Sequence, residues 1–326
     1  MKKGVRILLV AVALVVILLG SLLVYFFSKY PDAGPAPNLT IAPTAARLER
    51  GRYLVNNVSV CLNCHSTRDW TKFSGPTIPG TDGKGGERLG EEFGLPGTLF
   101  ASNITPSGIG KISDGGLMLA ITSGIGKDHR ALFPIMPYPN FTKMSDEDLY
   151  SIIAYVRTLK PIENSVPERT LNFPLNLIVR MIPKPHSPRT VPVRSDTVGY
   201  GEYLVTAASC SACHTRMKKG EPIPGMAFAG GNEFVLPQGT VRSANITPDD
   251  ETGIGGWTKD LFVLKFKQFA TPDSTTTSPE SMGYNSVMPW TDYAGMTEDD
   301  LGAIFAYLRT LTPVHNLVEK FTPKAQ

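Results

Sequence analysis

The longest uncharged and most apolar stretch of the chain lies close to its N-terminus. Residues 7–27 form a run of 21 positions without a charge, close to the ~20 residues that a helix needs to cross a bilayer core. No small-residue cleavage pattern follows this run, which favours a retained anchor over a cleaved signal peptide. Three basic residues precede it and one follows, a bias that keeps the N-terminus in the cytoplasm (Lys2, Lys3, Arg6 and Lys29). The pattern predicts a single-pass anchor in the cell inner membrane over residues 1–30 and a spacer over 31–45, with the remainder facing the periplasm.

Beyond the spacer, apolar residues recur at helical spacing in short stretches. Four such stretches predict helices (46–58, 146–158, 198–208 and 298–310). Two of them begin at capping motifs, Ser145-x-x-Asp148 and Thr297-x-x-Asp300, and end before a proline. Residues 74–110 and 220–256 are rich in glycine and proline, and we expect loop there rather than sheet. The chain therefore reads as an all-α protein.

The pattern of the first half recurs in the second half in the same order. The repeated elements are Gly-x-Tyr-Leu-Val (51–55 and 201–205), Cys-x-x-Cys-His (61–65 and 210–214), Ile-Pro-Gly (78–80 and 223–225), Asn-Ile-Thr-Pro (103–106 and 245–248) and Met-Pro-aromatic (136–138 and 288–290). Because the order is kept and only the loop lengths differ, the repeat predicts two tandem copies of one domain. The predicted copies span 46–162 and 197–313, with a tail over 314–326.

A proline-rich segment separates the two copies. Residues 161–195 carry seven prolines, which predict a linker over 163–196 without regular structure. The linker contains an apolar stretch, residues 171–182, that we expect to pack along a domain surface.

Composition narrows the possible classes of protein. A chain of 326 residues with 42% hydrophobic residues fits two globular domains of ~150 residues each and excludes intrinsic disorder. Four cysteines are too few for a disulfide-dense secreted scaffold. A net charge of +3 is too slight an excess to indicate nucleic acid as the partner.

The four cysteines all belong to the two Cys-x-x-Cys-His motifs. Two cysteines three positions apart fit on one helical turn, where both thiols can add to the vinyl groups of a haem while the next histidine reaches the iron. The cysteines and histidines concerned are Cys61, Cys64 and His65 in the first motif, and Cys210, Cys213 and His214 in the second. A zinc ribbon would need a much shorter separation of the two motifs, and a thioredoxin-like pair would need a βαβ context. Structural disulfides would leave the histidines unexplained, so the motifs predict two covalently bound haem c groups.

The second axial ligand of each iron is predicted to be methionine. Only two pairs of methionines repeat in register, Met136 with Met288 and Met144 with Met296. The second pair directly precedes the predicted helix caps and suits a hydrophobic staple. The first pair lies in a loop where a thioether could face a haem, as in electron-transfer cytochromes. His129, His186 and His315 are expected on the surface or in loops, and His129 stays open as an alternative ligand because it lies seven residues before Met136.

Together with Ala-Tyr-x-Arg-Thr-Leu (154–159 and 306–311), these motifs resemble class I cytochromes c. More closely, they resemble the membrane-bound cytochrome c subunits of bacterial periplasmic alcohol, gluconate and aldehyde dehydrogenases. Those subunits commonly carry three haem motifs, whereas this chain has two, so the resemblance implies a shorter diheme relative.

The resemblance also implies roles for individual residues. Pro79 and Pro224 either place a carbonyl beside the proximal imidazole or are plain loop prolines. Asn103 and Asn245 match glycosylation sequons, but their repetition before proline favours a structural role in the haem loops. Trp257 and Trp290 are expected to give aromatic packing near the second haem.

The function expected from these features is electron transfer without substrate chemistry. The donor would be a periplasmic or membrane-bound dehydrogenase, and the acceptor a terminal oxidase, a quinone or another cytochrome. The alternative is a diheme peroxidase or oxidase, which would need one iron with an open or displaceable position.

Overall fold

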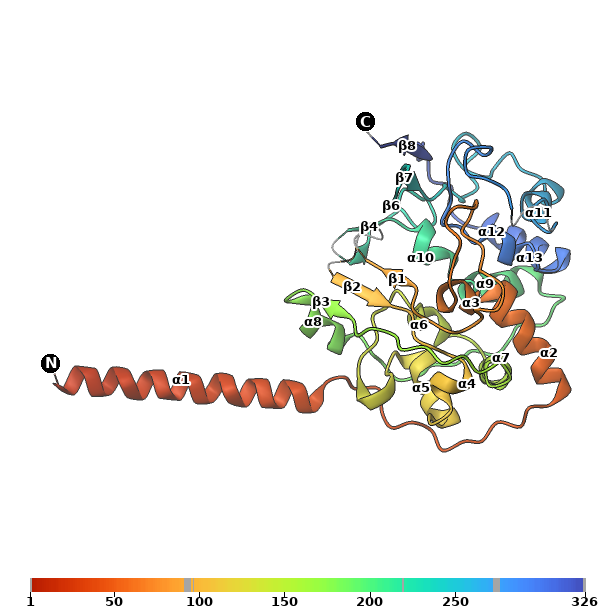
Figure 1. Ribbon diagram of the computed structural model, residues 1–326. Coiled ribbons are helices and arrows are strands. Elements are labelled where there is room, and N and C mark those ends of the chain that lie inside the picture. The colour runs from red at the N-terminus through yellow and green to blue at the C-terminus, as the bar shows by residue number, and fades with distance from the viewer. Residues whose placement is uncertain (1, 91–94, 96, 219, 272–275, 325–326) are drawn as a thin grey trace.

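The computed structural model describes residues 2–90, 95, 97–218, 220–271 and 276–324. Helix α1 (Lys2–Lys29) stands away from the globular part as a long, isolated rod (Figure 1). It is long and apolar enough to cross a membrane, and its apolar stretch is not buried against the rest of the protein. The predicted apolar helix is therefore present.

The helices of the globular part repeat in order in the two halves. The first half contains α2 (Ala45–Tyr53), a π-helical turn (Leu54–Val58), α3 (Cys61–His65), α4 (Pro106–Ile109), α5 (Asp114–Ser123), a 3₁₀ turn (Lys127–His129), α6 (Tyr138–Phe141) and α7 (Asp146–Val156). The second half contains α9 (Thr197–Ala207), α10 (Cys210–His214), α11 (Lys259–Lys267), α12 (Trp290–Tyr293) and α13 (Glu298–Leu308). Ser145 and Thr297 accept hydrogen bonds from the backbone N–H groups of Asp148 and Asp300, as the capping motifs predict. The four predicted helices are present to within a few residues.

The expectation of an all-α fold without sheet is wrong in the glycine-rich regions. The strands are β1 (Arg88–Leu89), β2 (Gly97–Phe100), β3 (Thr170–Leu171), β4 (Met217–Lys218), β5 (Glu221–Pro222), β6 (Glu233–Leu236), β7 (Gly239–Arg242) and β8 (Phe321–Pro323). They form three small antiparallel sheets, ordered β1-β2-β3, β4-β5 and β6-β7-β8.

Glycine is what permits two of these pairings. A Cβ atom on Gly97 would lie 2.3 Å from the carbonyl oxygen of Thr170, and one on Gly239 would lie 2.3 Å from that of Thr322. Both glycines also have positive φ, 137° and 155°. Glycines that predict loop in the sequence therefore allow two strands to approach each other closely.

The linker is also more ordered than predicted. It contributes β3, helix α8 (Leu175–Ile178) and a 3₁₀ turn (Val179–Met181). Val179 is completely buried, in agreement with the expectation that this apolar stretch packs on the globular surface.

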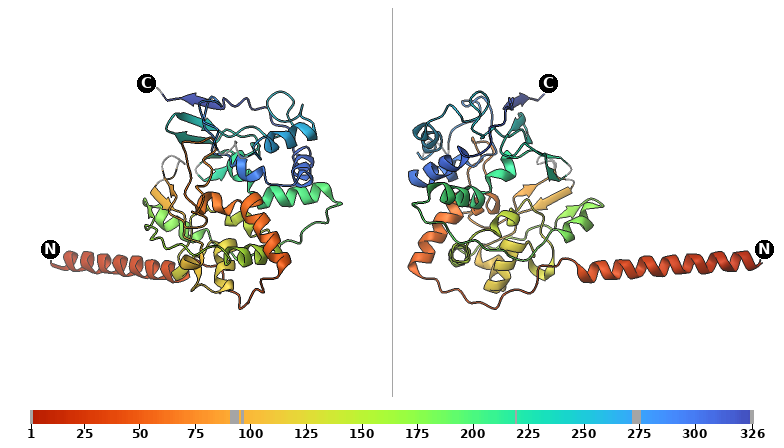
Figure 2. Two further views of the ribbon diagram at one scale, coloured as in Figure 1. Left: turned by 45° about the vertical axis from the view of Figure 1, so that its right-hand side comes forward. Right: turned by 180° about the vertical axis from the view of Figure 1, so that it is seen from behind.

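The two halves lie directly against each other (Figure 2). Buried residues of both halves form one hydrophobic core. In the first half α2 crosses α7, and in the second α9 crosses α13. The Tyr53 hydroxyl of α2 donates to the Asp300 carboxylate of α13 at 2.7 Å, and the Tyr203 hydroxyl of α9 donates to Asp148 of α7 at 2.7 Å. Each half therefore supplies a tyrosine to the first turn of the other half's last helix. Because both carboxylates are buried, these charge-assisted bonds hold the halves in a fixed orientation.

Candidate haem sites

The two Cys-x-x-Cys-His motifs form equivalent one-turn helices, α3 and α10. Each is preceded by a residue in the left-handed region, Val60 with φ 42° and Ser209 with φ 56°. This sharp change of direction redirects the chain from α2 or α9 into the motif helix. On a single turn the two cysteines, three positions apart, lie on the same side, as attachment to two vinyl groups requires. Cys64 and Cys213 are exposed, and Cys61 and Cys210 are partly buried.

The histidine of each motif is held by one backbone carbonyl. Nδ1 of His65 lies 2.7 Å from the Ser102 oxygen, and Nδ1 of His214 lies 2.7 Å from the Ala244 oxygen. Burial lowers the pKa of both imidazoles, while the carbonyl contacts oppose that shift. A neutral ring whose Nδ1–H donates to the carbonyl keeps its Nε2 lone pair for a metal.

Of the two alternatives for Pro79 and Pro224, the structure favours plain loop prolines. The orienting carbonyls belong to Ser102 and Ala244, the residues before Asn-Ile-Thr-Pro. A backbone carbonyl can come from any residue type, so the sequence held no specific signal for these positions.

The Asn-Ile-Thr-Pro segments have the structural role that their repetition predicts. Asn103 accepts from the backbone N–H and hydroxyl of Thr105 at 2.9 and 2.7 Å, and its amide donates to the Ile162 carbonyl at 2.8 Å. Asn245 makes the same contacts to Thr247 and to the Val314 carbonyl. These bonds fix the loop that carries the histidine-binding carbonyl against the segment after the last helix.

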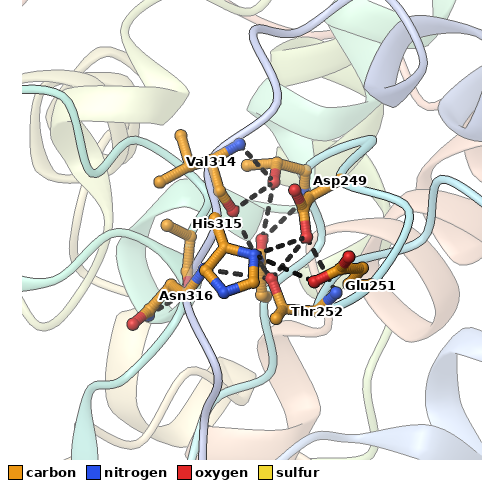
Figure 3. Close-up of polar contacts among 9 residues, drawn as sticks. Asp249, Glu251, Thr252, Val314, His315 and Asn316 are labelled. Carbon is orange, nitrogen blue, oxygen red and sulfur yellow. Dashed lines mark hydrogen bonds and ion pairs between the residues drawn. The ribbon is translucent and has the colours of Figure 1, made fainter.

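In the second half the same network extends to Asn316, whose backbone N–H donates to the Thr252 hydroxyl (Figure 3). His315 is exposed there, with Nδ1 3.6 Å from Asp249 and 3.7 Å from Glu251. His186 contacts Asp146 at 3.0 Å, and the exposed His129 contacts the Pro31 carbonyl at 3.1 Å. All three histidines thus have partners in surface regions or loops.

The two repeated methionine pairs occupy different environments. Met144 and Met296 are fully buried in the core, which fits the predicted staple. Met136 and Met288 are partly buried, and the carbonyl of each accepts a bond from the second residue on, Tyr138 or Trp290, at 2.7 and 2.8 Å. The two loops therefore have the same turn at the methionine.

The Met288 loop is also held by the first half. The Ser74 hydroxyl donates to the Met288 carbonyl, and the backbone N–H of Ser74 donates to Asn285 at 3.0 Å. The indole of Trp290 packs on Phe266 and Phe269 at 5.2 and 5.3 Å between ring centroids. Trp257 also packs against the core. The loop of one half therefore depends on contacts from the other.

Helix α12 lies between the two motifs. The Asn63 amide in α3 donates to the Asp292 carboxylate at 2.8 Å, and the Tyr293 hydroxyl donates to the Ala208 carbonyl just before α10 at 3.0 Å. Asp292, Asn63 and Ser74 do not stand out in the sequence, because their repeat counterparts are of other residue types. They connect the halves and have no reason to recur within each.

Burial raises the pKa of the Asp292 carboxyl to about 6, although Arg68 and the Asn63 bond act in the opposite direction. The folded state thus holds this proton more tightly than an unfolded aspartate of pKa 3.8. The stabilising contribution is complete below pH 3.8 and is lost as the pH rises through about 6.

Asp292→Asn should therefore gain stability relative to the wild type as the pH rises. The expected relative gain is about 2 kcal/mol between pH 4 and 7, measured by denaturant unfolding of the haem-loaded protein. Asparagine can still accept from Asn63, so the variant changes the charge while keeping that bond. If the free energies of unfolding of the two proteins changed equally with pH, this prediction would be contradicted.

The donor set fits a c-type haem. Each motif offers two thiols on one side of a helical turn and one imidazole whose Nδ1 lies against a backbone carbonyl, so that Nε2 points away from that carbonyl. Within the described ranges, no three His, Cys, Asp or Glu side chains gather into a group that could hold a metal ion.

Comparison with known proteins points the same way. No family model matches the chain. It is similar to the cytochrome c subunit of the quinone alcohol dehydrogenase of Gluconacetobacter polyoxogenes, with 30% identity over 86% of this chain and 59% of the relative. The gluconate 2-dehydrogenase cytochrome c subunit of Pantoea cypripedii is 26% identical over 82% of this chain and 60% of the relative. A diheme cytochrome c-type protein of Cereibacter sphaeroides is 33% identical over 38% of this chain and 42% of the relative.

The chain spans about three fifths of the length of the first two relatives. Those names describe cytochrome c subunits of dehydrogenases. The chain is therefore homologous, over most of its length, to the cytochrome c subunits of alcohol and gluconate dehydrogenases.

Proposed function

We propose that the protein is a membrane-anchored diheme cytochrome c that takes electrons from a dehydrogenase and passes them to the respiratory chain. The observation that carries this proposal is the duplicated imidazole geometry, in which His65 and His214 each bond one carbonyl at 2.7 Å and direct Nε2 away from it. Two equivalent sites in one chain suit relay of electrons better than chemistry on a substrate.

In this proposal each half is one cytochrome c domain, over residues 46–162 and 197–313. Cys61 and Cys64 would attach one haem, and Cys210 and Cys213 the other. His65 with Met136, and His214 with Met288, would be the axial pairs. Such a haem supplies one-electron redox chemistry, at a potential that the thioether raises. The protein's own groups hold the imidazoles in one orientation and carry the methionine loops.

The position of helix α12 favours electron transfer between the two haem sites of one chain. It contacts α3 through Asp292 and the approach to α10 through Tyr293. Tyr53 and Tyr203 also form hydrogen bonds between the two halves. The distance between the halves is therefore fixed within one chain, without a partner protein. A fixed separation favours transfer between the haems over independent reaction of each.

The dehydrogenase donor is proposed from the relatives' names, and the acceptor would be a terminal oxidase, a quinone or another cytochrome. Helix α1 would act as a retained anchor in the inner membrane, with the haem domains in the periplasm. An anchor confines the protein to the plane of the membrane and raises its effective concentration near membrane partners.

The haem content tests this function directly. Alkaline pyridine haemochrome analysis of the purified full-length protein should give two haems per chain. The double variant Cys61→Ser, Cys64→Ser should retain one haem, and the matched variant Cys210→Ser, Cys213→Ser should also retain one. No covalent haem in the wild type, or a haem content unchanged in either variant, would contradict the proposal. Copurification from detergent-solubilised membranes would then identify the dehydrogenase.

A further inference from the structure

An uncovered apolar surface lies on the linker, outside both haem sites. Phe173, Ile178 and Met181 expose 79%, 44% and 48% of their surface, although Val179 among them is completely buried. The buried valine fixes this short segment to the globular part, so the other three side chains stay directed outward. We call these three residues the linker patch.

The linker patch lies beside the exit of the apolar helix. The Arg180 guanidinium stands over the Phe27 ring of α1 at 5.1 Å from its centroid and donates to the Tyr30 carbonyl. Helix α8 also lies on the side of the globular part from which α1 projects (Figures 1 and 2). A bilayer crossed by α1 would end near Lys29 and so would meet this side of the protein.

Positive charge gathers at the same place. Burial and the neighbouring charges of Arg130 and Arg180 lower the pKa of Arg169. Among the described residues, none of these three arginines takes part in an ion pair, and Nε of Arg180 is buried without a hydrogen-bond partner. Apolar side chains bordered by unpaired arginines are typical of surfaces that rest on anionic lipid.

We propose that the linker patch lies in the interface of the bilayer around the exit of α1, with Arg130, Arg169 and Arg180 facing anionic lipid phosphates. This inference rests on the membrane anchoring in the proposed function. A second contact besides α1 fixes the orientation of the globular part relative to the membrane. It places the first half, to which the linker patch is attached, next to the lipid surface.

Thiol accessibility in vesicles tests the inference on the full-length, haem-loaded protein. All four native cysteines would be bound to haem, so an introduced cysteine would be the one reactive thiol. Phe173→Cys is compared with Leu317→Cys, a residue 83% exposed in the C-terminal segment, and with Leu14→Cys inside α1. The probe is a charged, membrane-impermeant maleimide, and the rate of modification is read by mass spectrometry.

In vesicles of phosphatidylethanolamine and phosphatidylglycerol, Phe173→Cys should react about tenfold more slowly than Leu317→Cys, equivalent to ~1.4 kcal/mol of protection. Equal rates at these two positions, with Leu14→Cys unreactive, would overturn the linker-patch contact and leave the anchor intact. Reaction at all three positions would instead contradict the anchor, and the inference with it. The protection should also weaken in vesicles of phosphatidylcholine alone, and unchanged protection there would overturn the role of the arginines.

Discussion

Met136→Ala and Met288→Ala should each remove the methionine–iron charge-transfer absorption of one ferric haem and leave that of the other. The reason is that each methionine is proposed to hold a separate iron opposite His65 or His214. Loss of the thioether should lower the reduction potential of the affected haem by on the order of 0.1 V or more, within the ~0.8 V range that axial ligands span. Spectra of the ferric protein and a redox titration would measure both effects.

Met282→Ala is the matched control, because Met282 lies six residues before Met288 and is 40% exposed. That variant should keep both absorption bands and both potentials. A wild-type ferric spectrum of the high-spin type, or bands that survive in Met136→Ala and Met288→Ala, would contradict the axial assignment. A high-spin wild type would favour the enzyme alternative, which requires an open position on iron.

The parts of the fold that could be predicted from the sequence are those encoded by neighbouring residues. Ser145 and Thr297 cap helices through bonds three residues away, and a 21-residue uncharged run is a local pattern. The Cys-x-x-Cys-His motifs are also local, so their chemistry could be inferred without knowledge of the fold. Their placement on single helical turns follows from the spacing of the two cysteines.

The parts that could not be predicted depend on contacts between distant segments. Strand β2 is paired by β3, more than 70 residues later, and Gly97 adopts its positive φ beside that strand. Ser102 and Ala244 act through backbone atoms, which leave no mark on residue type. Sequence patterns indicate side-chain chemistry and local conformation. The pairing of β2 with β3 and the two orienting carbonyls depend on neither of these, so the sequence did not indicate them.

The internal repeat also does not predict the contacts between the halves. The repeat identifies what each half needs for itself, such as Asn103 and Asn245 in the histidine-orienting loops. Tyr53 and Tyr203 do recur, but each bonds an aspartate of the other half, Asp300 or Asp148. A repeated residue can therefore stabilise the contact between the two halves rather than the half to which it belongs. Its repetition alone does not show which of these two roles it has.

Gly51→Ala should strongly destabilise the protein, although alanine is the better helix former. Replacing a helical glycine by alanine normally adds about 1 kcal/mol of stability. Here a Cβ on Gly51 would lie 2.0 Å from the carbonyl oxygen of Ser151, where α2 crosses α7. Backbone atoms cannot rotate away, so the two helices must separate.

Overpacking of this kind costs up to about 3 kcal/mol and occasionally more, which exceeds the gain in helix propensity. Gly201→Ala should act in the same way, because its Cβ would lie 1.9 Å from the Ala303 oxygen at the crossing of α9 and α13. Gly256→Ala is the matched control, since the nearest contact of its Cβ is 3.9 Å. Denaturant unfolding of the haem-loaded proteins should give lower midpoints for the first two variants and an almost unchanged one for the third. If Gly51→Ala were as stable as Gly256→Ala, the close crossing of α2 and α7 would be wrong, and with it the geometry that carries Tyr53 to Asp300.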